Sequence, residues 1–411
     1  MLRRYRTSLR SLGQQKGVFV LAVVIVIVLM KTLLPLRFGL NARDKRLHSG
    51  DRPRYLHHST FRAEPDHRYE TKLSKALREL EIEGQLRGNA TAPQTLWQIM
   101  LGQTAGAQQR GEDSILFQEK NSDWEYMLVT SEWADSFITE TLASIPDLAY
   151  LYEMYPHNVL RADLLRYLIL WYYGGYYSDM DIFPARSIKS CPALRDAGFA
   201  DTVDPDISLV VGVEIDEPFA SPQKMHDWHW VRSYGFVQYT MYAPQRFSPL
   251  LREIIVRVLS HTRRHIDQSN FFLGARYNEL ATLEITGPGV FTDAVLDVLS
   301  DTLPASHPLI QESVKADAGL GDMVPPSGAS PIQRVTWAPF YRLKLPRCIK
   351  GSDAKLGKQL GGLCVLPVNS WGNGQRHSEA EGFNSPQACV NHRFGGTWKP
   401  WKQSWQKYLL G

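Results

Sequence analysis

The stretch Asn158–Pro184 places the tightest limits on what this 411-residue chain can fold into. Its first half repeats apolar residues at steps of three and four, the pattern of a helix, and Gly174-Gly175 ends that helix. Tyr176–Ile182 then has the composition of a strand. Because residues two apart in a strand face the same way, we expect Asp179 and Asp181 to present two carboxylates to one side.

Two carboxylates held side by side are costly unless a cation neutralises them. The pair Asp179 and Asp181 therefore predicts a metal site. The alternative for these two acids is a solvated turn at the end of a strand.

A second polar pair interrupts the apolar helix. Asp163 and Arg166 stand three residues apart, hence on one face, and the helix leads directly to the two acids. We expect this pair to point into the same pocket, where an acid and a guanidinium can hold the hydroxyls of a sugar. A local ion pair is the alternative.

Buried strands and helices alternate through the rest of the body. The residues 96–102, 124–129 and 209–213 are predicted as strands, and 247–266 and 290–302 as helices. This alternation is typical of an α/β domain with a largely parallel sheet. Residues 320–411 are rich in Gly, Pro and Trp and are expected to be mostly loops.

The N-terminal region has the layout of a membrane anchor. The formal net charge of the chain is +4, but residues 1–16 hold five basic residues and no acid, which leaves a net charge of −1 on the rest of the chain. Because the excess positive charge is confined to this tail, it gives no argument for a nucleic-acid partner. The apolar run 17–36 follows, and its positive flank predicts a type II signal anchor with a lumenal body. A cleaved signal peptide is the alternative. The predicted organisation is a cytosolic tail at 1–16, a transmembrane helix at 17–36, a lumenal stem at 37–91 and a catalytic domain at 92–411.

Four cysteines fit a lumenal body. They all lie in the second half of the chain, and four cysteines allow three pairings among which the sequence does not choose. The four are Cys191, Cys348, Cys364 and Cys389. A sequon at Asn89 predicts a glycan, with a chance occurrence as the alternative.

Taken together, the motifs resemble glycosyltransferase family 32. Arg161-Ala162-Asp163 with Arg166-Tyr167, then Gly174-Gly175 and Tyr177-x-Asp179-x-Asp181, resemble the DxD sugar-binding region of that family, which includes the fungal initiating α-1,6-mannosyltransferases. The segments that resemble other parts of these enzymes are 92–102, 212–214, 238–239, 286–288, 365–367 and 391–400. The opening segment departs from the family pattern, because Trp97 stands where His is expected and Met100 where Trp is expected. Which side chain supports the nucleotide base therefore stays open.

This resemblance implies a GT-A fold that binds a nucleotide sugar and a divalent cation such as Mn²⁺, and that transfers the sugar with retention. It implies a Golgi mannosyltransferase that uses GDP-mannose and acts on protein-linked glycans, with a Golgi transferase complex as a candidate partner. The residues implied for donor binding are Trp97, Gln98, Arg161, Asp163, Arg166, Tyr167, Gly174, Gly175, Trp398 and Lys399. Catalysis is assigned to Asp163, Arg166, Asp179 and Asp181.

The third metal ligand implied is His392. It lies in a segment similar to the closing motif of glycogenin-like transferases, where the histidine binds metal and a lysine meets the diphosphate. If this is right, the fold must bring His392 within coordination reach of Asp181. The alternatives are a partly buried histidine bound to backbone, and His377 as a rival ligand.

The acceptor side is less constrained by the sequence. Trp228 and Trp230 are expected to stack on sugars, and Glu214 and Asp216 to position an acceptor hydroxyl. A core or loop role for the tryptophans and a helix cap for the acids are the alternatives. Other functions considered are a retaining transferase for a UDP-sugar, one with a sphingolipid acceptor, and a catalytically silent lumenal lectin or scaffold.

Overall fold

A computed structural model describes residues 59–88, 91–102, 110–199, 204–269, 274–318 and 334–393. The predicted tail, the anchor at 17–36, Asn89, Trp398 and Lys399 lie outside these ranges. No helix within them is long and apolar enough to cross a membrane.

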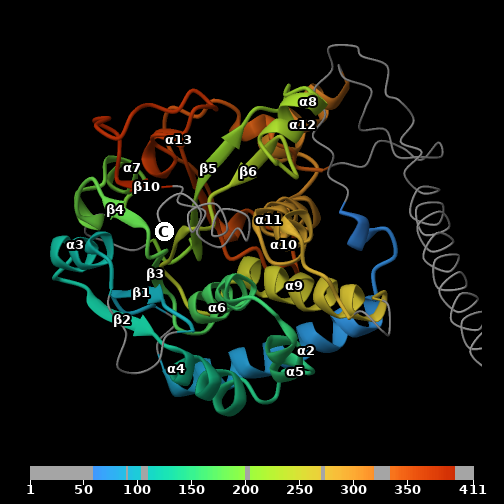
Figure 1. Cartoon of the computed structure of the whole chain (residues 1–411). Coiled ribbons are helices and arrows are strands. Elements are labelled where there is room, and N and C mark those ends of the chain that lie inside the picture. Colours follow the sequence, from blue (N-terminus) through green and yellow to red (C-terminus); the bar gives the residue numbers. More distant parts are fainter. Residues whose placement is uncertain are drawn as a thin grey trace, which may run out of the picture. The chain divides into compact units, whose positions relative to one another are not determined.

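A central sheet organises the described residues (Figure 1). Its strand order is β2-β1-β3-β7-β5-β9-β8, and β6 pairs with β5 outside this path. The strands are β1 (Thr95–Ile99), β2 (Glu125–Val129), β3 (Gly175–Ser178), β5 (Leu209–Asp216), β6 (Tyr234–Phe236), β7 (Thr240–Ala243), β8 (Arg347–Ile349) and β9 (Leu363–Leu366). A separate ladder joins β4 (Ile182–Pro184) to β10 (Val390–His392).

The mixed α/β class is confirmed, but the sheet is less parallel than predicted. The pairs β1–β2, β1–β3 and β5–β9 are parallel. Strand β7 lies between β3 and β5 and runs antiparallel to both, while β6 and β8 are also antiparallel to their neighbours. The sheet is therefore mixed, with both parallel and antiparallel pairs.

Helices cover both faces of the sheet. The described α-helices are α2 (His67–Arg87), α3 (Glu112–Lys120), α4 (Ser131–Ser136), α5 (Leu148–Met154), α6 (Asn158–Tyr172), α7 (Pro192–Asp196), α8 (Pro222–Asp227), α9 (Pro249–Asp267), α10 (Glu279–Ile285), α11 (Pro288–Thr302), α12 (Pro308–Ala318) and α13 (Val368–Trp371). The predicted strands at 96–102, 124–129 and 209–213 and the predicted helices at 247–266 and 290–302 are confirmed, with small shifts at their ends.

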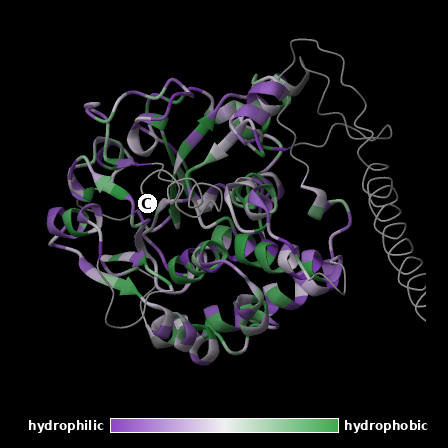
Figure 2. Ribbon diagram, in the orientation of Figure 1, coloured by the Kyte–Doolittle hydropathy of each residue, from purple (hydrophilic) through white to green (hydrophobic). Residues whose placement is uncertain are grey.

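Two apolar cores lie on opposite sides of the sheet. On β5, Val211 belongs to the core that contains α6, α9 and α11, whereas its neighbour Val210 belongs to the core that contains α7. This alternation follows from the two-residue repeat of a strand. Figure 2 shows apolar residues along the central strands and on α6 and α9. The larger core makes α6 a rigid support for the polar residues that it carries.

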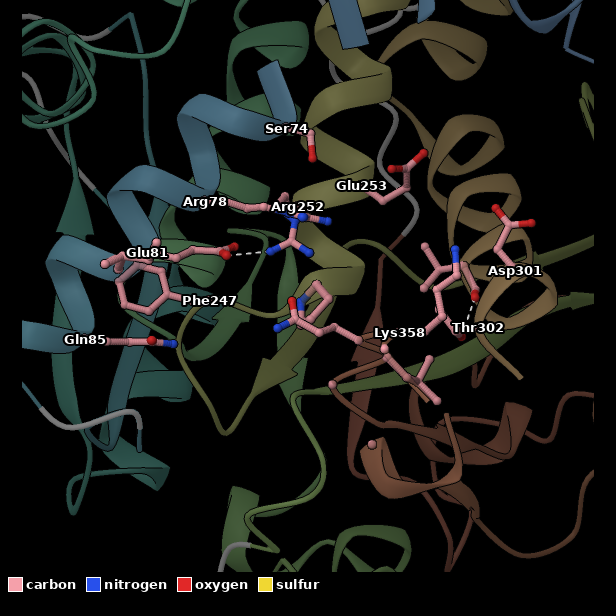
Figure 3. A pocket seen from close by; sticks show the side chains of 18 of the residues that line it. Ser74, Arg78, Glu81, Gln85, Phe247, Arg252, Glu253, Asp301, Thr302 and Lys358 are labelled. Carbon is pink, nitrogen blue, oxygen red and sulfur yellow. Dashed lines mark hydrogen bonds and ion pairs between the residues drawn. The ribbon is translucent and has the colours of Figure 1, made fainter. Parts of the chain in front are cut away.

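Helix α2 lies within the segment that we assigned to a stem, and it packs on α9. Leu73 and Leu77 are fully buried. Glu81 accepts a hydrogen bond from the Trp171 indole at 3.0 Å. It also forms an ion pair with Arg252 on α9, and Figure 3 shows this pair among the residues that line a pocket. The folded body therefore begins before the boundary that we drew at residue 91.

Removing the charge of Glu81 is expected to destabilise the protein. Breaking a buried ion pair leaves an uncompensated charge and costs about 3–5 kcal/mol, so Glu81→Gln should lower the free energy of unfolding by an amount near that range. The matched control is Glu79→Gln on the same helix, whose 3.8 Å pair with Lys75 is exposed and should change stability by less than about 0.5 kcal/mol. Urea unfolding followed by fluorescence measures both. Equal effects of the two variants would contradict the role given to Glu81.

Candidate functional site

The two acids of the DxD motif lie in a turn, not on one strand face. Strand β3 ends at Ser178, and the backbone N–H of Ile182 donates to the Asp179 carbonyl at 3.3 Å, which closes the turn before β4. The prediction of a continuous strand over Tyr176–Ile182 is therefore wrong. Because the turn breaks the two-residue alternation, the side chains of Asp179 and Asp181 meet different partners.

Other elements fix the backbone of this turn. The Asp179 N–H donates to the Tyr239 carbonyl at 2.8 Å, and the Gln98 side chain donates to the Asp179 carbonyl at 3.1 Å. Gln98 in turn accepts from Ser114 and Tyr126 at 2.6 and 3.0 Å. The turn is thus held by β1, α3 and the residue before β7.

Arg166 joins the first acid of the motif to the acid on helix α6. Its Nη2 lies 2.9 Å from Asp163 Oδ1 and 3.3 Å from Asp179 Oδ1. The Tyr177 hydroxyl also donates to Asp179 Oδ1, and its ring lies under the guanidinium at 5.1 Å. Burial raises the pKa of Asp179, while the charge of Arg166 opposes that rise. The predicted convergence of Asp163 and Arg166 with the DxD motif is present in the structure.

Asp163 is enclosed by protein partners. Its Oδ2 accepts from Thr286 at 2.8 Å and its Oδ1 from Gln238 at 3.4 Å. The Tyr167 hydroxyl binds Gln238 Oε1 at 2.6 Å. Burial raises the pKa of Asp163 to about 7, against the lowering effect of Arg166. Gln238 and Thr286 lie in segments that resemble the family. Both donate to Asp163, which explains physically why these distant segments belong to the same site.

His392 lies beside the second acid of the motif. Its Nε2 is 3.2 Å from Asp181 Oδ1, across 211 residues of sequence. The β4–β10 ladder sets this distance, because His392 pairs in register with Ile182. The ring of Tyr239 packs on the imidazole at a centroid distance of 4.3 Å. The predicted proximity of His392 to Asp181 is therefore present in the structure.

A disulfide anchors the strand that carries His392. Cys389, directly before β10, is bonded to Cys191, and the second disulfide joins Cys348 to Cys364 across β8 and β9. Together the two disulfides make up one of the three pairing schemes that four cysteines allow. The first disulfide ties β10 to the start of α7 and so to the segment that follows the DxD turn.

The carboxylate of Asp181 and the imidazole of His392 form a donor pair that suits a divalent ion such as Mn²⁺. Burial acts to raise the pKa of Asp181, but the contact with His392 holds it below the ordinary value, so this acid is ionised. Its side chain is 41% exposed and accessible to a ligand. No group of three or more His, Cys, Asp or Glu close enough to hold a metal occurs among the described residues. Asp179 is the member of the predicted ligand set that faces elsewhere, towards Arg166.

A cleft of about 600 Å³ opens beside His392. Glu214, Trp228, Trp230 and His377 line it, so three of the residues predicted on the acceptor side face the same space. Burial raises the pKa of Glu214 to about 7, opposed by the nearby His392. His377, the rival ligand, packs against both tryptophans, and its Nδ1 lies 2.8 Å from the Ser378 hydroxyl.

Several residues predicted for the site lie elsewhere. Trp97 is buried in the larger core, where its indole donates to the Gly174 carbonyl at 2.9 Å. Arg161 donates to the Glu153 carbonyl at 3.1 Å. Asp216 accepts from the Arg342 N–H at 2.7 Å and is buried. These three side chains have structural partners within the fold.

The glycine pair serves the backbone of the fold. Gly175 has φ +95°, and a Cβ there would lie 2.5 Å from the Thr95 carbonyl. Gly174 has φ +70°, and a Cβ there would lie 2.9 Å from the Ala243 carbonyl. Left-handed backbone and close strand approach both require glycine here. The donor contact of these glycines stays a prediction.

Two residues of the site were missed as functional candidates. Tyr239 accepts the backbone hydrogen bond of Asp179 and packs on His392. Arg393 donates to both carboxylate oxygens of Asp113 at 2.5 and 2.7 Å, while its N–H donates to the Asp181 carbonyl at 3.3 Å. Only the adjacency of Arg393 to His392 in the sequence could have drawn attention to it.

This chain is similar in sequence to a glycosyltransferase family model and to several known mannosyltransferases. Residues 113–197 match the model described as glycosyltransferase sugar-binding region containing DXD motif. The chain is 27% identical over 286 residues to the initiation-specific alpha-1,6-mannosyltransferase of Candida albicans, covering 69% of this chain and 65% of that protein. It is 42% identical over 59 residues to inositol phosphoceramide mannosyltransferase 2 of Schizosaccharomyces pombe, which covers 14% of this chain and 16% of that protein. Among solved structures, the PaToxG glycosyltransferase aligns with 16% identity and a TM-score of 0.34, over 64% of this chain and 92% of that one. The chain thus spans slightly less than two thirds of its Candida relative.

Proposed function

We propose that this glycosyltransferase, which carries the DXD sugar-binding region at residues 113–197, transfers mannose from GDP-mannose to a protein-linked glycan with retention at the anomeric carbon. The observation that carries the proposal is the contact between the side chains of His392 and Asp181, the latter two residues after the acid that belongs to the Asp163–Arg166–Asp179 network. The likeness to an initiation-specific alpha-1,6-mannosyltransferase supports mannose as the sugar.

Asp181 and His392 would hold the divalent ion, while Asp179, which we predicted as the third ligand, is bound to Arg166 and Tyr177. When bound, such an ion stabilises the negative charge that develops on a departing diphosphate. Arg166 orients Asp179 by binding it and Asp163 together. We retain Asp163 and Arg166 as contacts of the transferred sugar, and we add to them the role of holding the motif in place.

A lumenal Golgi location is part of the same proposal. The charge layout of residues 1–36 supports a type II anchor. The two disulfides support an oxidising compartment, because structural disulfides are rare where thiols are kept reduced.

A sphingolipid acceptor is the second candidate. It is favoured by the likeness to an inositol phosphoceramide mannosyltransferase, although that likeness covers 14% of this chain. The two candidates share the donor and differ in the acceptor, so assays with each acceptor separate them.

The test of the proposed function is hydrolysis of a panel of nucleotide sugars by the full chain in detergent, with Mn²⁺ and with a chelator. We expect GDP-mannose to be consumed only with the metal, and UDP-sugars to be left intact. Consumption of a UDP-sugar instead would replace the donor. If the protein neither binds nor consumes any donor, that result would support the lectin or scaffold alternative.

A further inference from the structure

Three aromatic side chains form one wall of the cleft beside His392. The rings of Trp228 and Trp230 stack with centroids 5.6 Å apart and planes inclined by 24°. The ring of His377 meets both edge-on, at 5.0 and 4.7 Å. We call Trp228, Trp230 and His377 the aromatic wall.

Separate segments hold the aromatic wall in place. Trp230 donates its N–H to the Met225 carbonyl at 2.9 Å. His229, between the two tryptophans, has φ 57°, a left-handed conformation that non-glycine residues seldom adopt. This backbone kink lets two tryptophans two residues apart stack on each other. The wall is therefore a built arrangement, not two side chains that happen to be exposed.

The wall faces ligand space and not the core. Trp228 remains 40% exposed although its ring is large and apolar. Glu214 and His392 line the same cleft, so the wall lies along the space that leads to the Asp181–His392 junction. An indole face in such a position offers a flat apolar surface to a ligand.

The charges of the cleft favour a neutral ligand. Arg232 is bound by both Glu284 and Asp293, at 2.7 and 2.6 Å. Arg393 is bound by Asp113 at both carboxylate oxygens. Arg376, which also lines the cleft, is exposed and has no acidic partner among the described residues. Because Arg232 and Arg393 are each paired with acids and Glu214 is present as an acceptor, a polyhydroxylated ring fits this cleft better than an anionic head group does.

We propose that the aromatic wall is the acceptor subsite, where Trp228 stacks on the apolar face of a neutral pyranose and Glu214 accepts a hydrogen bond from one of its hydroxyls. This rests on the proposed function for its reaction, and it deepens that function by naming the residues that select a glycan over an anionic lipid head group. The donor sugar is assigned by the proposed function to the Asp163–Arg166–Asp179 network, none of whose residues lines this cleft.

The test compares Trp228→Ala and Trp228→Tyr in the full chain with Mn²⁺. We expect Trp228→Ala to raise the KM for a mannose oligosaccharide roughly tenfold, consistent with the loss of one stacked ring, while hydrolysis of GDP-mannose keeps its KM. Trp228→Tyr retains a flat ring and should recover most of the acceptor binding. Tyr150→Ala, which removes an exposed aromatic residue on α5, is the matched control and should change neither KM.

Two results would overturn the proposal. If Trp228→Ala raises the KM for GDP-mannose and not that for the oligosaccharide, the wall holds the nucleotide base. If neither KM changes, or if inositol phosphate competes with acceptor and mannose oligosaccharides do not bind, the wall is not a glycan subsite.

Failure of the proposed function is distinguishable from failure of this inference. Binding of a mannose oligosaccharide is measured directly by quenching of tryptophan fluorescence, without any donor. Loss of that quenching in Trp228→Ala supports the subsite even in a protein that hydrolyses no GDP-mannose. Unaltered quenching in this variant would refute the subsite even in an active mannosyltransferase.

Discussion

Replacing His392 with alanine is expected to lower metal-dependent transfer at least about a hundredfold, because removing one electrostatic contributor to a developing charge costs that much or more. The same loss is expected for Asp181→Asn, which keeps the shape of the side chain and removes its charge. The two residues are 3.2 Å apart and share one bound ion in the proposed site. The kcat and the dependence of rate on Mn²⁺ concentration measure the effect.

Direct Mn²⁺ binding gives a second readout for these variants. The EPR signal of free Mn²⁺ should fall when the unaltered protein is added and fall much less with His392→Ala. His67→Ala on α2, whose side chain is 78% exposed, is the matched control and should behave as the unaltered protein does. If His392→Ala binds Mn²⁺ as tightly as the control, the histidine is a structural partner of Asp181 and not a ligand.

Substituting Arg166 with lysine is expected to reduce turnover by about one to two orders of magnitude, since a charge-assisted hydrogen bond is worth ~1.5–3 kcal/mol and each ~1.4 kcal/mol is tenfold. The planar guanidinium reaches Asp163, Asp179 and the Gln238 carbonyl at once, at 2.9, 3.3 and 3.1 Å. An ammonium group cannot reproduce that geometry. Asp163→Asn, which removes the charge that faces Arg166, should give a loss of similar size. The measurements are kcat with GDP-mannose and urea unfolding.

Arg161→Lys on the same helix is the control for this prediction. Arg161 contacts one carbonyl, that of Glu153, and its replacement should change stability by less than about 0.5 kcal/mol and leave kcat unchanged. Unchanged transfer in both Arg166→Lys and Asp163→Asn would return the pair to a purely local ion pair.

Periodicity was sufficient to predict the main helices and strands. The apolar repeat over 158–173 corresponds to α6, and the glycine pair ends it at Tyr172. The stretch at 247–266 corresponds to α9, where Pro249 begins the helix and every residue from Leu250 to Thr262 except Glu253 is buried. These elements could be predicted because their signals are local and strong.

Strand pairing could not be predicted, because it depends on distant partners. Nothing in Thr240–Ala243 indicates that β7 lies between β3 and β5, where it runs antiparallel to both. The DxD turn illustrates the same limit on a smaller scale. Tyr176–Ile182 has the composition of a strand, but the Ile182 N–H donates to the Asp179 carbonyl and closes a turn after β3, which sets the two acids apart.

The site was predicted well where distant motifs had to meet and poorly where neighbours had to be told apart. Asp181 and His392 were expected to meet, and they do. Trp97 and Gln98 were both expected at the donor, but adjacent residues on a strand face opposite sides. The fold puts Gln98 against the DxD turn and Trp97 in the core, and the sequence has no signal for which of them faces the site.

The bond between Cys191 and Cys389 bears on when the protein becomes competent during its biosynthesis. The bond spans 198 residues of sequence, and the β4–β10 ladder that it supports has only three residue pairs, too few to persist alone. The bond thus reinforces the position of His392 beside Asp181, together with the contacts that Arg393 makes with Asp113 and with the Asp181 carbonyl. We expect newly made chains to gain full activity only as this bond forms.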